Sequence, residues 1–216
     1  FKGVEETQLS KFWPYVFGGG GMDLKSSEVE KYSDLMSESQ HLVAADTLAA
    51  VNIPSVCRFL DVGGGKGTFV SELKKIHPKV DAAVFDLPGS HSENSGHRCI
   101  IGSFKEDELP AGYDIISLVR ILYDHRDETI RDLLGKAYSA LDKGGRLIVS
   151  EPMLGADRPT LWGDVYFAMY TLAMSTGKTR SPDQVSGFIK DAGFSNVTIH
   201  KSARPFITTV IEAQKT

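Results

Sequence analysis

Four glycines lie within five residues directly after an apolar run of this chain. An apolar run at residues 59–62 leads into Gly63, Gly65 and Gly67, and a helical pattern follows at once. Glycine adopts positive φ angles and lets another molecule approach the backbone closely. The N–H groups at the start of the next helix attract carboxylates and phosphates. The segment therefore predicts a pocket for a nucleotide-like ligand at a strand end.

The spacing of these glycines discriminates between ligands. The dinucleotide pattern G-x-G-x-x-G would need a glycine where Thr68 stands, and the phosphate loop would need Ser or Thr where Gly67 stands. A Tyr-x-x-x-Lys pair is also not found, since Tyr138 is followed four residues later by Asp142. The pattern favours S-adenosylmethionine (SAM), whose carboxylate the helix start could hold. An NAD-dependent oxidoreductase is the less favoured alternative.

Further polar side chains stand where predicted strands end. Asp61 lies in the first strand, and Asp86 follows Gly67 at about the distance typical of a ribose-binding carboxylate. Ser103 and Phe104, after a third strand, could lay a hydroxyl or a ring beside an adenine. Ligands of open α/β sheets lie outside the carboxyl ends of the strands, so we expect these residues at one cofactor site. A loop cap at Asp86 and core packing by Phe104 are the alternatives.

A second group of titratable residues follows later strands. Tyr123 and His125 come after a run at 115–118, and Glu151 after one at 147–149. Histidine, with an ordinary pKa of about 6.5 against about 10 for tyrosine, is the better proton acceptor near neutral pH. We predict His125 as the base, Tyr123 as an orienting group, and Glu151 as the residue that orients or polarises the base. Ordinary turn and strand-end roles are the alternatives.

An apolar helical pattern follows at about residues 165–174. Methionine adapts its shape to irregular apolar partners, and aromatic rings offer broad apolar faces. We predict that side chains in and just before this segment form an apolar wall of the substrate site, with core packing as the alternative: Trp162, Tyr166, Phe167, Met169, Tyr170 and Met174.

Strand-like and helical runs alternate along the chain and would position these residues. Expected strands are 59–62, 82–85, 99–101, 115–118 and 147–149, and expected helices are 29–51, 68–76, 128–141 and 182–192. This alternation predicts an α/β fold with a mostly parallel, doubly wound sheet. Two last runs, 197–199 and 206–211, have no helix between them and should pair antiparallel.

Local signals predict where the helices begin and end. Asp127 indicates an N-cap, and Gly144 with Gly145 indicates the end of the same helix. Ser181 followed by proline predicts a capped helix start, and Gly193 the end of that helix.

Composition excludes several classes of protein. The 216 residues are 41% hydrophobic and carry a formal net charge of -4, which argues against nucleic acid as the main ligand. No apolar run has the length of a membrane span, and the histidines and acids lack metal-site spacing. Cys57 and Cys99 are expected to be reduced core thiols of a cytoplasmic protein. Aromatic residues and then four glycines, at 18–21, indicate a linker over residues 1–28 before a single domain at 29–216.

Taken together, several motifs resemble the SAM-dependent small-molecule O-methyltransferases that carry an N-terminal dimerisation domain. The motifs are Asp61-Val62-Gly63-Gly64-Gly65-Lys66-Gly67, Phe85-Asp86-Leu87-Pro88, Gly102-Ser103-Phe104, residues 120–128, Gly144-Gly145-Arg146-Leu147 and Glu151. Within that family, Tyr32-Ser33-Asp34-Leu35-Met36, residues 150–153 and 163–174, and Arg204-Pro205-Phe206 are most similar to the carotenoid 1-hydroxy O-methyltransferases.

The resemblance implies a class I methyltransferase sheet with an antiparallel last strand, and methyl transfer from SAM to a hydroxyl group, here a tertiary carotenoid alcohol. It implies that Arg120 lines the cofactor site, that the full-length protein is a homodimer, and that a polyene substrate brings the protein transiently to a membrane surface. The chain departs from the family where Tyr123 replaces the usual histidine base and Ser103 an acidic residue. We also expect that this sequence lacks the family's N-terminal domain. A catalytically silent SAM-binding or partner-docking domain is therefore the alternative function.

Overall fold

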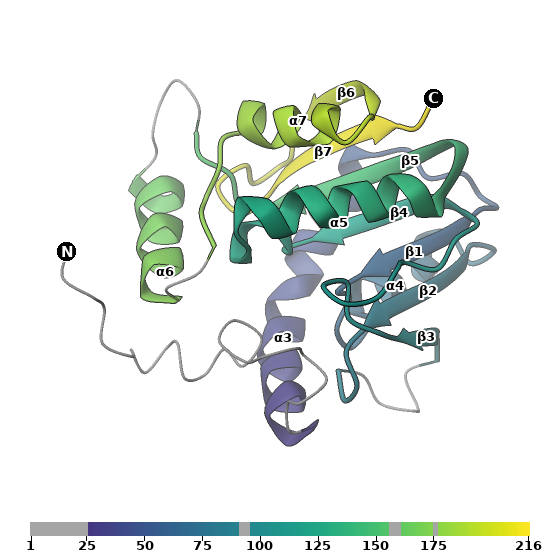
Figure 1. Ribbon diagram of the computed structural model, residues 1–216. Coiled ribbons are helices and arrows are strands. Elements are labelled where there is room, and N and C mark those ends of the chain that lie inside the picture. Colours follow the sequence, from purple (N-terminus) through teal and green to yellow (C-terminus); the bar gives the residue numbers. More distant parts are fainter. Residues whose placement is uncertain (1–25, 91–95, 156–160, 175–176) are drawn as a thin grey trace.

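A computed structural model describes residues 26–90, 96–155, 161–174 and 177–216 (Figure 1). For residues 26–36, 161–162 and 174 only the backbone is described. The linker predicted over residues 1–28 falls almost entirely outside the described part of the chain.

One seven-stranded sheet, in the order β3-β2-β1-β4-β5-β7-β6, forms the centre of the protein. The five strands from β3 to β5 are parallel, and β7 runs antiparallel to both β5 and β6. The predicted mostly parallel sheet with an antiparallel end is confirmed. The strands are β1 (Arg58–Val62), β2 (Asp81–Asp86), β3 (Arg98–Ile101), β4 (Tyr113–Val119), β5 (Leu141–Glu151), β6 (Ser195–His200) and β7 (Thr209–Gln214).

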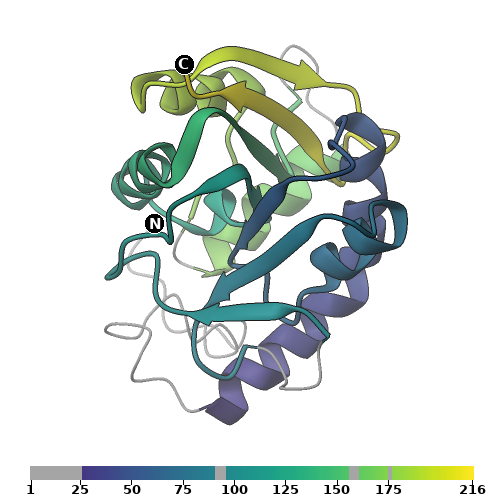
Figure 2. The ribbon, with the colours of Figure 1, turned by 90° about the vertical axis from the view of Figure 1, so that its right-hand side faces the viewer.

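Helices cover both faces of the sheet (Figure 2). On one face α3 and α4 pack over a core that includes Val43, Phe69 and Leu73, and on the other α5 and α7 pack through Leu134 and Ile189. The helices are α3 (Ser26–Ala50), α4 (Thr68–Ile76), α5 (Asp127–Ala140), α6 (Tyr166–Met174) and α7 (Pro182–Asp191), with a π-helical turn η3 (Leu161–Val165) and a 3-10 turn η2 (Leu122–Asp124).

Local signals predicted some helix ends correctly. Ser181 caps α7 through a capping box with Gln184, and Gly193 follows the helix with a φ of 101°. Asp127, in contrast, is not an N-cap. It is the first helical residue of α5, its carboxylate pairs with Arg180, and Arg126 occupies the cap position.

The glycines at 144 and 145 do not end α5 either. The helix ends at Ala140 and the chain passes directly into β5, whose pairing with β4 shifts register between Tyr113 and Ile115. Gly144, with a φ of 79°, lies in this irregular part of the strand and donates its N–H to the carbonyl of Lys215. The two glycines therefore lie in an irregular part of a strand. In sequence, glycines at such a position look the same as glycines that end a helix.

The last strand begins later than the 206–211 run predicted. The carbonyl of Arg204 accepts the N–H groups of Ile207 and Thr208, which closes a turn before β7 starts at Thr209. The guanidinium of Arg204 also forms a two-point pair with the buried carboxylate of Asp46 on α3, at 2.7 and 2.9 Å. This long-range pair holds the chain in a turn where local propensity favours a strand.

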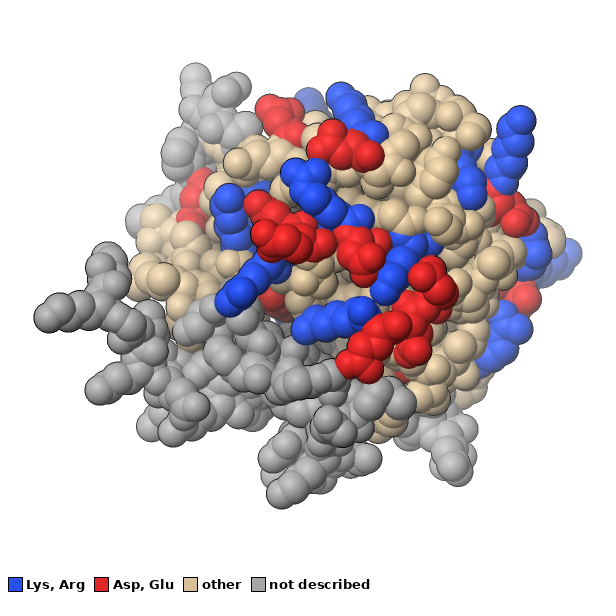
Figure 3. Space-filling model, in the orientation of Figure 1, with Lys and Arg blue, Asp and Glu red and all other residues tan. Residues whose placement is uncertain are grey.

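Other expectations concern absences. Cys57 and Cys99 are both free thiols, as predicted, but only Cys57 is a buried core residue, and Cys99 is partly exposed. No group of metal-ligating side chains occurs among the described residues. None of the described helices combines the length and apolarity needed to cross a bilayer. On the face shown in Figure 3, acidic and basic side chains are interspersed rather than segregated by sign.

Candidate functional site

The backbone between β1 and α4 forms a turn that only glycines accommodate comfortably. In this glycine turn, residues 63–67, the φ angles of Gly63, Gly65 and Gly67 are 71°, 55° and 76°. Gly63 donates its N–H to the carbonyl of Phe85 at 2.8 Å, so the turn is bonded to the end of β2. A Cβ atom built on Gly65 would have no atom of the described residues within 4 Å. The backbone is therefore accessible to a ligand at Gly65.

Asp86 joins the end of β2 to the glycine turn. One carboxylate oxygen accepts the N–H of Gly65 and the other accepts the N–H of Leu87, both at 2.6 Å. Burial raises the pKa of Asp86 to about 6, although both hydrogen bonds favour the charged form. Asp86 thus lies beside Gly65, where the sequence predicts the cofactor site. Its carboxylate also caps the loop after β2 through Leu87, which is the alternative role.

Asp61 lies beneath the same turn. Its side chain is completely buried, and one carboxylate oxygen accepts the hydroxyl of Ser117 on β4 at 2.6 Å. A Cβ on Gly64 would collide with the other oxygen. Burial raises the pKa of Asp61 to about 7. Asp61 therefore supports the turn from below and does not reach the open side at Gly65.

Ser103 and Phe104 lie after β3, at the same edge of the sheet. Ser103 is buried, and its N–H donates to the carboxylate of Asp107 at 2.8 Å. The ring of Phe104 packs on the core and meets the ring of His125 edge-on, with 5.2 Å between centroids. Phe104 thus packs on the core and also places its ring next to His125, so both roles considered for it from the sequence are compatible with its position.

The segment after β4, residues 120–125, carries the catalytic candidates and is called the Tyr123 turn below. Arg120 has a φ of 61°, unusual for a residue with a side chain, and its guanidinium donates to Ser39 on α3 at 2.7 Å. Its backbone N–H donates to the carbonyl of Ser150 at 2.8 Å. Arg120 therefore ties the start of the turn to α3 and to β5.

Tyr123 and His125 occupy different surroundings although only one residue separates them. The ring of Tyr123 is buried against Phe167 and Tyr170 of α6, at centroid distances of 6.2 and 6.0 Å. His125 packs against Phe104 instead. Burial raises the pKa of Tyr123 far above its ordinary value, so the phenol stays protonated. Tyr123 thus faces α6, and His125 faces the residues after β3.

His125 is neutral at physiological pH. Burial, with the nearby cations Lys105 and Arg180, lowers its pKa to about 3. No hydrogen bond to its ring nitrogens occurs within the described part of the chain. An uncharged imidazole of this kind can accept a proton, but its low pKa makes it a weak base.

Glu151, at the end of β5, does not orient His125 directly. Its buried carboxylate accepts the N–H groups of Leu122 and Tyr123, at 2.9 and 3.3 Å. Burial raises the pKa of Glu151 to about 8. The carboxyl group therefore fixes the backbone that carries the catalytic candidates.

The predicted apolar wall is described only in part. Phe167 and Tyr170 pack on Tyr123, whereas Tyr166 and Met169 on the same helix are 61% and 60% exposed. The side chains of Trp162 and Met174 lie outside the described residues. Half of α6 therefore contacts the Tyr123 turn, and the other half presents apolar groups outward.

Sequence reasoning missed Arg180. This buried side chain, 2% exposed, donates hydrogen bonds to the carbonyls of Leu122 and His125. Nothing local singles it out, because it precedes an ordinary helix cap and the two carbonyls that it binds in the Tyr123 turn lie more than fifty residues away.

Comparison with known proteins gives a consistent picture. A family model for the O-methyltransferase domain matches residues 2–195. Demethylspheroidene O-methyltransferase from Rhodobacter capsulatus is 45% identical over 99% of this chain, and the enzyme of that name from Cereibacter sphaeroides is 42% identical over 98%. The chain covers only 55% and 58% of the lengths of these two relatives.

Solved structures agree with the fold. Human N-acetylserotonin methyltransferase in complex with SAM superimposes with a TM-score of 0.80 at 25% identity, covering 97% of this chain and 63% of that one. LaPhzM superimposes with a TM-score of 0.82 at 18% identity, covering 97% of this chain and 70% of the other. The seven-stranded sheet and its helices are thus those of a known fold.

Proposed function

Because this chain belongs to the O-methyltransferase domain family, we propose that it transfers a methyl group from SAM to a hydroxyl oxygen of a small apolar acceptor. The observation that carries the proposal is the accessible backbone at Gly65, bonded to the carboxylate of Asp86 at adjacent strand ends. Residues 29–216 form the catalytic domain in this proposal, and residues 1–28 are a linker.

The residues present fit the cofactor. Gly63, Gly65 and Gly67 would accommodate its methionine part, and Asp86 would bind the ribose hydroxyls, exchanging its bond to Gly65. Ser103, Phe104 and Arg120 would line the same site, and Asp61 would support it from below. When bound, SAM supplies an electrophilic methyl carbon. The raised pKa of Asp86 supports this role. The buried carboxylate has two N–H donors, and the ribose hydroxyls would stabilise its charged form further.

We propose a tertiary carotenoid alcohol as the acceptor. The relatives at 42–45% identity are named for O-methylation of demethylspheroidene, and α6 offers the apolar surface that a long polyene needs. Phe167 and Tyr170 would meet the acceptor beside Tyr123, and Trp162, Tyr166, Met169 and Met174 would extend the wall. A cytoplasmic homodimer that touches membranes transiently completes the proposal, and the exposed Tyr166 and Met169 support an apolar contact of this kind.

The three catalytic candidates take separate roles in this mechanism. Tyr123, which stays protonated, donates a hydrogen bond that orients the acceptor oxygen. His125, which is neutral before the reaction, accepts the proton released when the ether forms and becomes an imidazolium. Glu151 holds the backbone N–H groups of Leu122 and Tyr123 and so fixes both. Alignment of the acceptor oxygen with the methyl carbon contributes much of the rate, because oriented reactants need no further ordering.

The test is methyl transfer by the purified protein with radiolabelled SAM and demethylspheroidene, alongside calorimetry with S-adenosylhomocysteine and with NADH. We expect labelled product and binding of S-adenosylhomocysteine alone. Binding of S-adenosylhomocysteine without turnover, in the full-length protein, would support the silent-domain alternative. Binding of NADH alone would refute the cofactor assignment.

A further inference from the structure

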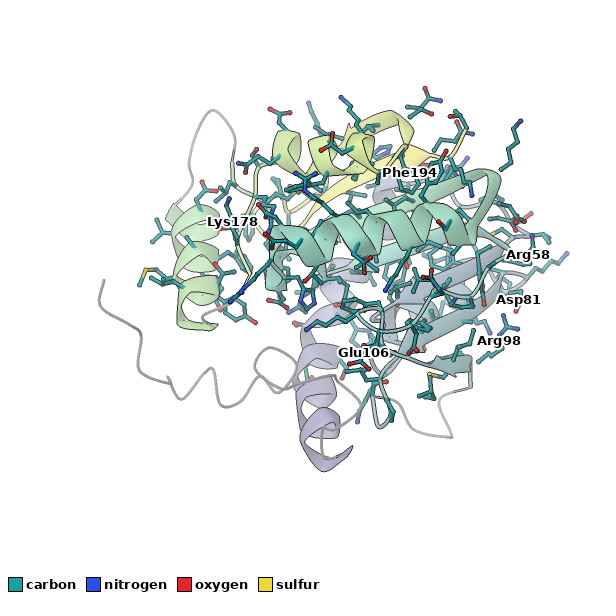
Figure 4. All side chains as sticks on the ribbon, viewed as in Figure 1. Arg58, Asp81, Arg98, Glu106, Lys178 and Phe194 are labelled. Carbon is teal, nitrogen blue, oxygen red and sulfur yellow. The ribbon has the colours of Figure 1, made fainter. Side chains whose placement is uncertain are left out.

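We propose that Arg180 is a positioning residue for methyl transfer, because its guanidinium fixes the backbone of the Tyr123 turn. The inference rests on the function proposed above. Arg180 lies in the segment that joins α6 to α7 and passes beside the start of α5, where Figure 4 labels the neighbouring Lys178.

Every donor of the guanidinium has a partner. Nη1 donates to the carbonyls of Leu122 and Lys178, at 3.2 and 2.8 Å, and Nη2 donates to the carbonyl of His125 at 3.0 Å. Nε and Nη2 both donate to one carboxylate oxygen of Asp127. An arginine has five N–H donors in a rigid fork, and all five are used here. A lysine, with three donors on one nitrogen, cannot reproduce this arrangement.

The backbone next to Arg180 reinforces the same contact. Lys178 donates its N–H to the carbonyl of Tyr123 at 2.9 Å, and Arg180 accepts the N–H of Leu154 at 2.9 Å. Gly177 has a φ of 75°, and a Cβ there would collide with the carbonyl oxygen of Tyr123. The segment therefore lies directly against the turn.

Arg180 and Glu151 hold complementary groups of one turn. Glu151 accepts the N–H groups of Leu122 and Tyr123, while Arg180 binds the carbonyls of Leu122 and His125. The residues that carry the two catalytic candidates are thus fixed from both sides. Phe167 and Tyr170 of α6 pack on the ring of Tyr123, so the predicted acceptor wall contacts the same turn.

Stability alone does not account for a cation at this position. Burying an ion pair costs desolvation that its attraction often fails to repay, and apolar replacements are commonly as stable. The partner carboxylate of Asp127 is 42% exposed, whereas Arg180 is 2% exposed. An apolar residue could not donate hydrogen bonds to the carbonyls of Leu122, Lys178 and His125.

Arg131 provides a matched control. Its guanidinium lies 4.5 Å from the centroid of the Phe188 ring, which Arg180 also faces at 5.8 Å, and it pairs with Asp191 at 2.9 Å. Both arginines line a pocket of about 210 Å³ that opens between α5 and α7. Arg131 has no hydrogen bond to the Tyr123 turn within the described residues.

The experiment compares Arg180→Lys, Arg180→Ala and Arg131→Ala in the full chain. For Arg180→Lys we expect kcat to fall by about 10- to 100-fold, as when reacting groups are misplaced by about 1 Å, with the affinity for S-adenosylhomocysteine changed less than about threefold. Amide exchange at Leu122, Tyr123 and Lys178 should accelerate at least about tenfold, because local opening becomes easier. Arg131→Ala should leave both readouts near wild type.

Chemical rescue separates positioning from folding. Arg180→Ala opens the floor of the pocket, so millimolar guanidinium should restore part of the lost kcat. Unchanged exchange and unchanged kcat in Arg180→Lys would overturn the proposal, as would equal losses in Arg131→Ala. If Arg180→Ala does not fold, Arg180→Lys still decides the matter. If the wild type shows no methyl transfer the proposed function fails, while the exchange measurements still test whether Arg180 holds the turn.

Discussion

The glycine turn and the Tyr123 turn follow adjacent strands, β1 and β4, yet they are held in different ways. The glycine turn takes its shape mainly from its own backbone, through positive φ angles at three glycines and a bond to the end of β2, where the carboxylate of Asp86 also accepts the N–H of Gly65. The Tyr123 turn takes its shape from side chains that come from distant parts of the chain, Glu151 and Arg180. The proposed cofactor site thus depends mostly on residues that are close in sequence, whereas the proposed catalytic site depends on residues that are far apart in sequence.

The largest expected effect concerns the Tyr123 turn. His125→Asn should lower kcat about 100-fold, at the lower end of general-base effects because a pKa of about 3 makes a weak base, with little change in SAM affinity. Tyr123→Phe should cost less, since it removes one orienting hydroxyl. Steady-state kinetics of both variants measures this.

The pH dependence provides the control for this prediction. Because His125 is neutral above about pH 3, kcat should show no limb near the ordinary histidine pKa. A larger loss from Tyr123→Phe would reverse the two roles. If His125→Asn changes only the affinity for S-adenosylhomocysteine, His125 belongs with Phe104 to the cofactor side.

The next effect concerns the glycine turn. Asp86→Ala should weaken binding of S-adenosylhomocysteine by about 1.5 to 3 kcal/mol, the range of hydrogen bonds to a charged group. Asp86→Asn retains an acceptor for the N–H of Gly65 and should lose less. Titration calorimetry on both variants checks the order. Equal affinity in Asp86→Ala and wild type would remove Asp86 from the cofactor site.

A third prediction tests whether the glycine turn depends on backbone conformation. Gly65→Ala should destabilise the fold by about 1–2 kcal/mol, the cost of a left-handed residue with a Cβ, although no atom of the described residues obstructs the methyl group. Gly135→Ala, in the middle of α5 and equally unobstructed, should stabilise by up to about 1 kcal/mol. Denaturant titration of the pair gives the comparison, and the same sign for both would contradict the argument.

The smallest effect concerns the buried carboxyl group that holds the Tyr123 turn. The pKa of Glu151 is raised to about 8, so the folded protein retains a proton that the unfolded chain has already lost above its ordinary pKa. Stability therefore falls as pH rises through this window. Relative to Glu151→Gln, the wild type should lose about 1 kcal/mol between pH 7 and 8. Parallel pH profiles of the two proteins would show that Glu151 is already ionised.

Sequence alone predicts the glycine turn well for a physical reason. Strand, glycines and helix are contiguous, and α4 begins and ends at the predicted residues 68–76. The position of Asp86 also follows from spacing along the chain. In contrast, the bonds from Glu151 and Arg180 to the Tyr123 turn span between 28 and 58 residues, and no local pattern records them.

The errors have the same origin. Gly144 and Gly145 follow a long helix, as a helix stop would, but pairing with β4 places them inside β5. The 206–211 run has strand composition, but the pair between Arg204 and Asp46 keeps its first half in a turn. In each case a tertiary contact overrides a correct local preference.

The way in which the Tyr123 turn is held has an evolutionary consequence. Glu151 and Arg180 bond to main-chain N–H and carbonyl groups of residues 122, 123 and 125, which every amino acid except proline offers. The hydrogen bonds that hold the turn therefore do not depend on which side chains these positions carry, although the side chains of Leu122 and Tyr123 also pack in the interior. Natural selection, or a saturation library at positions 123 and 125, can therefore test new catalytic groups while the main-chain hydrogen bonds of the turn stay the same.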